Sequence, residues 1–328
     1  MNIGFFVRHF TEMGTEVAVY DYAKYNEEIL NNKSYIICFT PETQGSMHGW
    51  PTTRVSYDKF NKRFKIIEIQ HIGEMTNIIK EFNLSFFYTL THGGEDVYQF
   101  NNKDIWGNCK TIKHCVYSTS LPEGDFHFSI SNTLNKYFNT SVQVIPHIVN
   151  LPLINENLRN ELQIPQESFV FGRHGGFYSF NIDYVNEIII EYLNLNENCY
   201  FLLLNTSKFY EHPRIIYLDL NTDEVYKSKF INTCDVMIHA QKDGETFGLA
   251  VAEFSSKNKP VITCNCGHFR EHINILGDKG IIYHSKEELR DIFMNIETII
   301  KKKSDWNAYK FYSPENVMNL MKSYIFDK

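Results

Sequence analysis

The sequence has no excess of basic residues and no long apolar run. Lys and Arg number 32 against 39 Asp and Glu, which gives a formal net charge of −7. This balance provides no overall attraction to nucleic acid or to an anionic bilayer. No stretch reaches the roughly 18 uninterrupted apolar residues of a membrane helix, and the apolar start is too short for a signal sequence. We therefore expect a soluble, cytoplasmic protein without a transmembrane segment, and nothing in the sequence supports peripheral membrane contact.

Cysteine and glycine patterns that indicate other classes of site are also missing. The seven cysteines lack metal-ligand spacing, and their odd number argues against a complete disulfide framework. Cys264 and Cys266 form the one close pair, and two reduced thiols at the end of a buried strand explain it more simply than a redox or metal role. Neither G-x-x-x-x-G-K-[ST] nor G-x-G-x-x-G after a strand occurs, which argues against a P-loop NTPase and an NAD enzyme.

The sequence does show the alternation of predicted strands and helices that is typical of a globular α/β protein. Its 328 residues exceed a single ordinary core of roughly 100–200 residues, so two domains are expected. Short runs that are apolar on both faces alternate with stretches of helical periodicity, which predicts parallel sheets covered by helices on both sides. The runs are Ile3–Val7, Tyr35–Phe39, Lys65–Ile69, Phe86–Thr91, Lys113–Tyr117 and Val142–Ile145 in the first half, and Phe169–Gly172, Tyr200–Leu204, Ile215–Leu218, Val236–His239, Val261–Thr263 and Ile281–Tyr283 in the second.

This pattern predicts two Rossmann-like, doubly wound domains in tandem. The break falls between Pro146 and Pro165, in a polar, Asn-rich stretch. We therefore assign residues 1–150 to an N-terminal domain and residues 151–304 to a C-terminal domain. Residues 305–328 are expected to form a helical tail, interrupted by Pro314, that packs back on the N-terminal domain. Ligands of open α/β sheets lie beyond the carboxyl ends of the strands, so functional residues are expected in the strand-end loops.

The most informative segment follows the predicted strand Val236–His239. A glycine-containing loop brings Glu245 to the sheet edge, and a helix predicted to begin at about Thr246 offers free backbone N–H groups to an anion. Glu253 lies two helical turns beyond Glu245, so both carboxylates can face one pocket and accept hydrogen bonds from vicinal hydroxyls. By spacing alone, the alternative is that Glu245 complements the helix dipole and Glu253 is a solvated surface acid.

Residues 245–253, followed by Lys-Pro-Val-Ile at 259–262, resemble the E-x7-E signature of retaining GT-B glycosyltransferases, in particular family 4. Cys266–Glu271 is similar to the G-G-x-x-E turn of that family, and Gly277–Tyr283 to its G-x-x-G-x-L-V strand. The segments keep their order and spacing over about the last hundred residues, so the resemblance is more specific than a single motif. It implies two Rossmann-like domains facing across a cleft, with the donor domain C-terminal and the acceptor-side domain N-terminal.

The resemblance assigns roles to residues of the second half. It implies that Glu245 contacts the hydroxyls of the transferred sugar and that Glu253 holds the ribose of the donor. It also implies that the backbone of Phe247, Gly248 and Leu249 lies near the diphosphate, in agreement with the expected helix terminus.

Arg173, in the strand-end segment Phe171–Gly176, resembles the family's arginine that pairs with the leaving diphosphate. A guanidinium fork matches phosphate oxygens and neutralises the charge that grows as the glycosidic bond breaks. The family's lysine six residues further on is replaced by Ser179, so Lys208 or the backbone at Gly175 and the next glycine is the candidate substitute. The alternative for Arg173 is a surface cation beside a glycine turn.

Two strand-end segments of the first half resemble other features of the same family. Gly14 and Thr15 open an apolar helix after the first strand, as in the family's glycine loop over the donor. His92, after the strand Phe86–Thr91, resembles the family's histidine close to the reacting sugar carbon. Both segments are also compatible with ordinary loops. Polar loops of this half, where the family binds acceptors, carry residues that nothing local distinguishes from surface residues: His48, Trp50, Arg54 and His71.

The resemblance, together with these residues, implies a metal-independent, retaining hexosyltransferase that moves a sugar from a nucleoside diphosphate donor to a hydroxyl acceptor, in glycan or glycoconjugate synthesis. No metal is expected, because dipoles and a guanidinium meet the phosphate charge and no D-x-D sequence stands at a strand end. Two alternatives stay open. One is a nucleotide-sugar epimerase or phosphorylase on the same scaffold, and the other is a protein that binds nucleotide-sugars or glycans without turnover, which the missing lysine favours.

Overall fold

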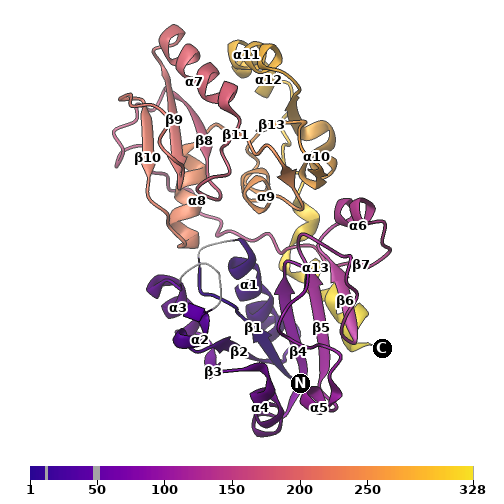
Figure 1. The fold of residues 1–328 in the computed structure, drawn as a ribbon. Coiled ribbons are helices and arrows are strands. Elements are labelled where there is room, and N and C mark those ends of the chain that lie inside the picture. Colours follow the sequence, from indigo (N-terminus) through magenta and orange to yellow (C-terminus); the bar gives the residue numbers. More distant parts are fainter. Residues whose placement is uncertain (12–13, 47–51, 328) are drawn as a thin grey trace. The chain divides into compact units, whose positions relative to one another are not determined.

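The computed structural model describes residues 1–11, 14–46 and 52–327, and the chain folds into two compact units (Figure 1). The first unit comprises Met1–Ile148 together with Tyr312–Lys328, and the second comprises Val149–Phe311. The chain therefore passes from the first unit to the second within the Asn-rich stretch, and its C-terminal segment returns to the first unit. Of the residues named above, His48 and Trp50 lie outside the described part of the chain.

The first unit contains a parallel sheet to which seven strands of the described residues contribute. Its strand order is β3-β2-β1-β4-β5-β6-β7, so the direction of winding reverses between β1 and β4. The strands are β1 (Asn2–Phe6), β2 (Lys33–Phe39), β3 (Lys65–Ile69), β4 (Leu84–Thr91), β5 (Lys110–Cys115), β6 (Phe126–Ser129) and β7 (Gln143–Val144). The helices are α1 (Gly14–Glu28), α2 (Pro41–Ser46), α3 (Arg54–Asn61), α4 (Met75–Phe82), α5 (Lys103–Trp106), α6 (Asn132–Phe138) and α13 (Pro314–Met321).

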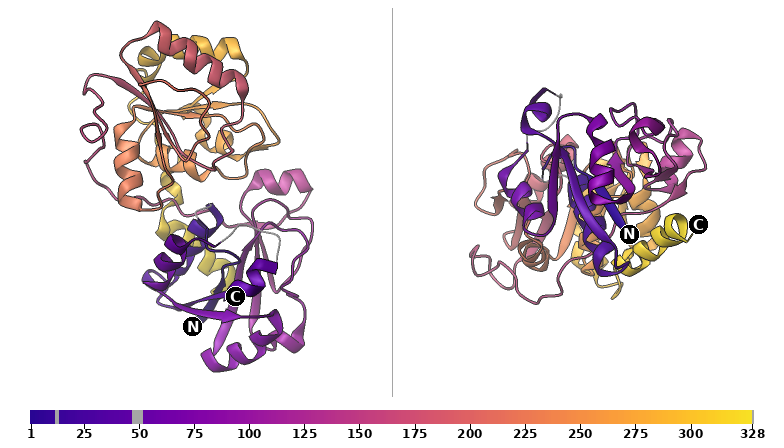
Figure 2. Two further views of the ribbon diagram at one scale, coloured as in Figure 1. Left: turned by 60° about the vertical axis from the view of Figure 1, so that its left-hand side comes forward. Right: turned by 90° about the horizontal axis from the view of Figure 1, so that it is seen from below.

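Helices cover both faces of this sheet (Figures 1 and 2). Successive side chains of a strand point to opposite faces, so Phe5 and Phe6 of β1 belong to different cores. Phe5 packs in the core that contains α1 and α13, and Phe6 packs in the core that contains Met75 of α4 and Trp106 of α5. The C-terminal segment thus completes a core that the first residues of the chain begin.

The second unit contains another parallel sheet, of six strands in the order β10-β9-β8-β11-β13-β15, and all its residues are described. The strands are β8 (Phe169–Arg173), β9 (Cys199–Leu204), β10 (Ile215–Leu218), β11 (Val236–His239), β13 (Val261–Cys264) and β15 (Gly280–Tyr283), and a separate small sheet pairs β12 (Gly244–Glu245) with β14 (Phe269–Arg270). The helices are α7 (Asp183–Leu195), α8 (Glu224–Thr233), α9 (Leu249–Ser256), α10 (Glu271–Leu276), α11 (Lys286–Met294) and α12 (Ile296–Ile300).

These two sheets confirm the predicted fold class, two α/β domains with doubly wound parallel sheets. In each sheet the winding reverses at one point, between β1 and β4 in the first unit and between β8 and β11 in the second. The carboxyl ends of the strands beside such a point form the ligand crevice of this architecture. In the second unit, those ends are Arg173 of β8 and His239 of β11.

Two predicted helix boundaries are wrong. α9 begins at Leu249 rather than at about Thr246, because the preceding Gly248 has a φ of 84°, a left-handed conformation that stops the helix from extending backwards. Pro314 does not interrupt the C-terminal helix but is the first residue of α13, where its missing N–H costs no hydrogen bond. Trp306, before that helix, packs in the core of the second unit.

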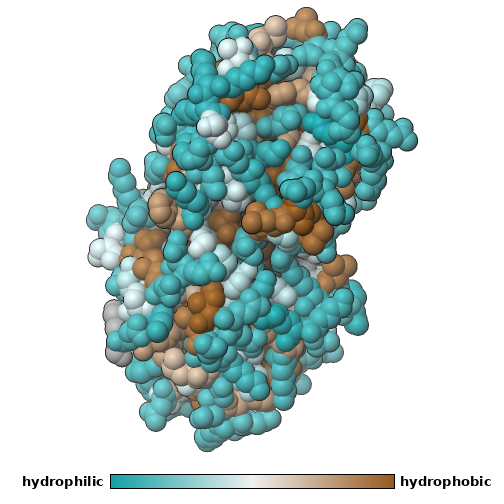
Figure 3. Space-filling model, turned by 180° about the vertical axis from the view of Figure 1, so that it is seen from behind, coloured by the Kyte–Doolittle hydropathy of each residue, from teal (hydrophilic) through white to brown (hydrophobic). Residues whose placement is uncertain are grey.

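The described part of the chain contains no helix that is long and apolar enough to cross a membrane. The face of the molecule in Figure 3 is mostly hydrophilic, with hydrophobic side chains in scattered groups. Most large apolar side chains instead gather in the cores that cover the two sheets.

Candidate functional site

A glycine-dependent loop positions Glu245 beyond the carboxyl end of β11. In this loop β12 pairs in parallel with β14, so that Gly244 lies beside Phe269 and Glu245 beside Arg270. Gly244 has a φ of 76°, and a Cβ atom on it would lie 1.9 Å from the carbonyl oxygen of Phe269. Only glycine fits there, and the position of Glu245 therefore depends on Gly244.

The Glu245 carboxylate, with 30% of its side chain exposed, begins a row of polar side chains. Its Oε1 atom lies 3.2 Å from Nε2 of His239. Nδ1 of His239 lies 2.8 Å from Oγ1 of Thr263, and this oxygen lies 3.1 Å from Nε2 of His272. Burial lowers the pKa of His272 well below its usual value, and the neighbouring His239 ring lowers it further. The row therefore ends in a buried, neutral imidazole.

The N-terminus of α9 lies next to the aliphatic part of the Glu245 side chain. A Cβ atom on Gly248 would lie 3.3 Å from Cβ of Glu245. Gly248 has no side chain with which to cap the helix, so the N–H groups that begin at Leu249 are available to an anion. Phe247 is buried, and its carbonyl oxygen accepts a 3.1 Å hydrogen bond from the Tyr309 hydroxyl. The fold thus brings a carboxylate and a helix N-terminus together at the switch point.

Glu253 lies within α9, where it is only 5% exposed, so the solvated-acid alternative is wrong. Its Oε1 accepts a hydrogen bond from Nζ of Lys227 of α8, and its Oε2 lies 2.9 Å from Nε2 of His174. Burial alone would raise the pKa of Glu253, but the Lys227 charge and the contact with His174 lower it to about 2. Both oxygens that the resemblance assigned to a ribose are therefore already engaged by side chains of this chain.

Arg173 is buried and enclosed by uncharged acceptors. Nη1 donates to the carbonyl oxygen of Asn205 and to Oγ1 of Thr206, both at 2.7 Å. Nη2 donates to the carbonyl oxygen of Gly176 at 2.6 Å and to Oγ of Ser179 at 2.7 Å. Ser179, which stands at the position of the family's lysine, therefore fixes the orientation of the guanidinium.

Arg173 is 2% exposed, so the surface-cation alternative is also wrong. Burial lowers the pKa of Arg173 to about 10, and the charge of Glu245 opposes this shift, so the two side chains lie within electrostatic reach. The next residue, His174, stacks on Phe254 of α9. His174, the residue after the end of β8, contacts Glu253 instead. Arg173 thus interacts with the charge of Glu245, whereas Glu253 is in direct contact with His174.

The two candidate substitutes for the missing lysine lie in different places. Lys208 is exposed, with Nζ 5.8 Å from the centroid of the Tyr217 ring. A Cβ atom on Gly175 would lie 3.3 Å from Nη2 of Arg173, and its carbonyl oxygen accepts a 2.9 Å hydrogen bond from Nδ2 of Asn205. Of the two, the backbone at Gly175 is the one beside the guanidinium.

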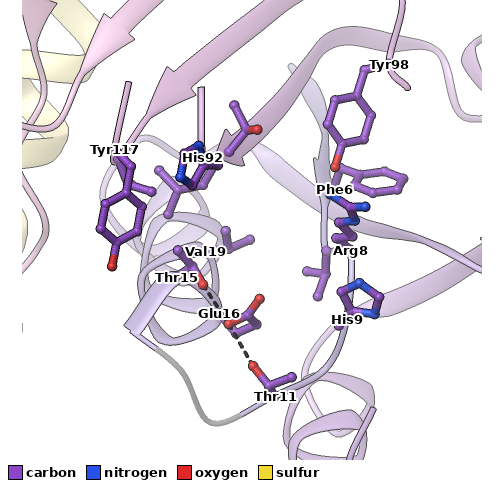
Figure 4. A pocket seen from close by; sticks show the side chains of 14 residues that line it. Phe6, Arg8, His9, Thr11, Thr15, Glu16, Val19, His92, Tyr98 and Tyr117 are labelled. Atoms are coloured by element: carbon purple, nitrogen blue, oxygen red, sulfur yellow. Dashed lines mark hydrogen bonds between the residues drawn. The ribbon is translucent and has the colours of Figure 1, made fainter. Parts of the chain in front are cut away.

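In the first unit, Thr15 and His92 line a cavity of about 320 Å³ at the carboxyl ends of β1 and β4 (Figure 4). Oγ1 of Thr15 donates a 2.7 Å hydrogen bond to Oε2 of Glu16, and the His92 ring stacks on Tyr117 with centroids 5.1 Å apart. Gly14 is exposed at the start of α1 and does not line the cavity. The other lining residues are Phe6, Val7, Arg8, His9, Thr11, Val19, Leu90, Thr91, Tyr98 and Val116.

Several residues around Glu245 and Glu253 were not predicted from the sequence. His239 had a usable signal, because it is a polar residue at the end of an apolar strand, directly before the loop. Thr263 is its register partner on β13, a relation that only the strand pairing reveals. Lys227 had no local signal, because the fold alone brings α8 beside α9.

Cysteines and metal ligands contribute no further site in the described part of the chain. No group of three or more His, Cys, Asp or Glu side chains there is arranged to hold a metal ion. The cysteines are free thiols, and Cys264 ends the buried strand β13. A hydrogen bond with Cys266 lowers the pKa of Cys264 to about 7, although burial acts in the opposite direction.

The sequence matches no protein-family model and no curated protein. Among solved structures, HepE of Anabaena in complex with UDP-glucose has a TM-score of 0.73 at 14% identity, over 100% of both chains. A glycosyltransferase from Rickettsia africae has a TM-score of 0.65 at 18% identity, over 97% of this chain and 93% of the other. A UDP-GlcNAc 2-epimerase from Neisseria meningitidis, bound to UDP-GlcNAc, has a TM-score of 0.64 at 10% identity, over 100% of both chains. At these identities the likeness is one of fold.

Proposed function

We propose that this chain, whose two parallel-sheet domains have the GT-B fold, is a glycosyltransferase that takes a sugar from a nucleoside diphosphate donor. The observation that carries the proposal is the setting of Glu245. Its carboxylate lies at the switch point of the second sheet, beside the N-terminus of α9 and within electrostatic reach of buried Arg173. Solved structures of this fold hold UDP-glucose and UDP-GlcNAc, which supports a UDP-sugar as the first donor to test.

The charge distribution of this site suits the departure of a diphosphate. Negative charge grows on the diphosphate as the glycosidic bond breaks, and the N–H groups from Leu249 onward supply positive potential without a metal ion. Arg173 adds a positive charge that its five uncharged acceptors hold in place, so no reorganisation is needed during the reaction. The acceptor hydroxyl attacks the sugar from the face that the diphosphate leaves, and the anomeric configuration is retained.

The two glutamates take different parts in this proposal. Glu245 accepts hydrogen bonds from the hydroxyls of the transferred sugar. Glu253 uses two of the roughly four lone-pair sites of a carboxylate for Lys227 and His174, and the others are left for ribose hydroxyls. Lys227 and His174 then orient the carboxylate toward the ribose.

The cavity of the first unit is proposed to bind the hydroxyl-bearing acceptor, a glycan or glycoconjugate. Glu16 and the threonines that hydrogen-bond to it offer polar contacts, and the stacked His92 and Tyr117 rings offer an aromatic surface. Sugars need both kinds of contact, because their hydroxyls form hydrogen bonds and their C–H faces pack on rings.

The decisive variant is Glu245→Gln, which keeps the size of the side chain and removes its charge. The wild-type chain is incubated with UDP-glucose, and then with GDP-, ADP- and dTDP-sugars, while release of the nucleoside diphosphate is measured. We expect release from one donor, lowered about 100-fold or more in Glu245→Gln. Glu288→Gln is the matched control, because Glu288 is a half-exposed glutamate that pairs with His284 after the edge strand β15, two strands away from β11. Equal release from Glu245→Gln and wild type would refute the proposal.

The reaction products separate this proposal from its alternatives. An epimerase converts the donor sugar to its epimer, which NMR of the reaction mixture detects, whereas a transferase releases UDP and a sugar or glycoside of retained configuration. A protein that only binds the donor shows a rise in Tm with UDP, by mass action, and no release. Activity that persists in EDTA supports the metal-independent mechanism, and activity that EDTA abolishes contradicts it.

A further inference from the structure

A row of buried polar side chains runs from the candidate catalytic carboxylate into the core of the second unit. Oε1 of Glu245, the ring of His239, the hydroxyl of Thr263 and the ring of His272 follow one another at separations of 3.2, 2.8 and 3.1 Å. They belong to β12, β11, β13 and α10, so four separate elements contribute to the row. His239 and Thr263 are register partners on adjacent strands, which fixes their distance through the backbone.

The protons of this row are not independent of one another. An ionised carboxylate only accepts hydrogen bonds, so the proton of a neutral His239 ring must lie on Nε2, toward Glu245. Nδ1 of His239 then accepts, and the single proton of the Thr263 hydroxyl points to it. The Thr263 oxygen in turn accepts from Nε2–H of His272. With His239 neutral, one arrangement of protons satisfies all three contacts of the row.

The buried end of the row is consistent with this arrangement. The arrangement leaves Nδ1 of His272 without a proton, and this atom has no partner of ordinary hydrogen-bond geometry among the described residues. The Glu245 backbone acts on this ring and raises its pKa, but burial and the His239 ring outweigh this effect. A bare acceptor in the interior costs less than an unpaired N–H, which native proteins almost never contain. Thr263 and His272 are fully buried and His239 is 6% exposed, so water has little access to supply other partners.

We propose that Thr263 and His272 are positioning residues that lock His239 in its Nε2–H tautomer, so that His239 donates to Glu245 and aims this carboxylate at the donor sugar. The tautomer lock rests on the geometry of the row, and its consequence for the sugar rests on the proposed function. Glu245 is the catalytic residue of the set, because it alone is accessible to a ligand, with 30% of its side chain exposed. His239 acts on Glu245, and the other two act on His239.

The test compares Thr263→Val, which removes the hydroxyl and keeps the branched shape, with Thr263→Ser, which keeps the hydroxyl. Nitrogen-15 NMR of the histidine rings reports which nitrogen carries the proton. In the wild-type chain and in Thr263→Ser we expect His239 protonated on Nε2, and in Thr263→Val a mixture of both tautomers. Protonation of His239 on Nδ1 in the wild-type chain would overturn the proposal without any variant, and so would an unchanged ring in Thr263→Val.

The kinetic test uses the same variants with UDP-glucose as the probe. We expect Thr263→Val to lower kcat about three- to tenfold, the range of one lost hydrogen bond, with KM changed less than twofold and with Thr263→Ser close to wild type. A disturbed tautomer with unchanged kcat would overturn the positioning role. If the wild-type chain does not turn over this donor, the proposed function fails for it, and the NMR result decides the tautomer lock by itself.

Discussion

Replacing Glu253 by Gln should destabilise the second unit strongly, although the substitution keeps the shape of the side chain. Glu253 is 5% exposed and engages Lys227 with one oxygen and His174 with the other. Glutamine retains a hydrogen-bond acceptor but removes the charge. Lys227, whose side chain is 11% exposed, is then left in the interior without a counter-charge.

Two lines of reasoning give a similar magnitude for this loss. Removing one member of a buried ion pair costs about 3–5 kcal/mol, because the remaining charge is uncompensated. Independently, the pKa of Glu253 falls from an ordinary value of 4.5 to about 2 on folding, which corresponds to about 3 kcal/mol at 1.4 kcal/mol per pH unit. Because the folded-state pKa is lowered, this stabilisation is complete above pH 4.5 and is lost as the pH falls through about 2. At pH 7 we therefore expect the free energy of unfolding to fall by about 3 kcal/mol.

The assay is urea unfolding and calorimetry at pH 7, followed on the transition of the second unit. For a domain of this size, about 3 kcal/mol lowers Tm by roughly 6–12 °C. The matched control is Glu191→Gln, which removes an exposed glutamate paired with Arg290 in the same unit and should leave the transition almost unchanged.

A double-mutant cycle then isolates the ion pair. Lys227→Met removes the partner charge, so Glu253→Gln combined with Lys227→Met should be less destabilised than the sum of the single variants by about 2 kcal/mol or more. Additive effects, or a loss below about 1 kcal/mol in Glu253→Gln, would show that burial of the pair has been misjudged. In that case the proposed orientation of Glu253 by Lys227 would also fail.

Two further predictions concern acid stability and the loop that carries Glu245. Burial lowers the pKa of His114 and of His147 to about 3. Below pH 6.5 the unfolded chain therefore binds protons at these two histidines, whereas the folded first unit does not. The stability of this unit should therefore be complete above pH 6.5 and lower by about 2 kcal/mol per histidine at pH 5, and a urea midpoint that is equal at pH 7 and pH 5 would contradict this. Gly244→Ala places a Cβ atom 1.9 Å from the Phe269 carbonyl oxygen at a φ of 76°, so we expect a loss of about 2–4 kcal/mol and of donor turnover. Gly94→Ala, whose Cβ meets nothing within 4 Å, is the control for thermal unfolding and should behave like wild type.

The architecture was predictable because its signals are local. A strand buried on both faces is a short apolar run wherever it occurs, and Ile215–Leu218 and Val236–His239 are strands over the predicted residues. The start of α9 was misplaced, because a sequence pattern does not reveal the left-handed φ of Gly248. The resemblance to the glycosyltransferase signature identified Glu245 and Glu253 as a pair. Nothing in their spacing indicated that Glu245 is partly exposed and Glu253 is buried.

The partners of the two glutamates depend on residues far apart in the chain. Glu253 pairs with a lysine 26 residues earlier, and His239 contacts Thr263, 24 residues later. Such contacts depend on which strands and helices become neighbours, and no local pattern encodes this. The same holds for Arg173, which the resemblance assigned to a phosphate and which the fold surrounds with five uncharged acceptors.

The sequence by itself determined the α/β class, the two sheets and the loop that carries Glu245, because apolar periodicity and glycine act over a few residues. Only the tertiary structure decided the electrostatic state of the site: which carboxylate is partly exposed, which is buried in an ion pair, and which imidazoles are buried. These properties arise from burial and from contacts between distant segments, since the energy of a charge depends on everything that surrounds it in space.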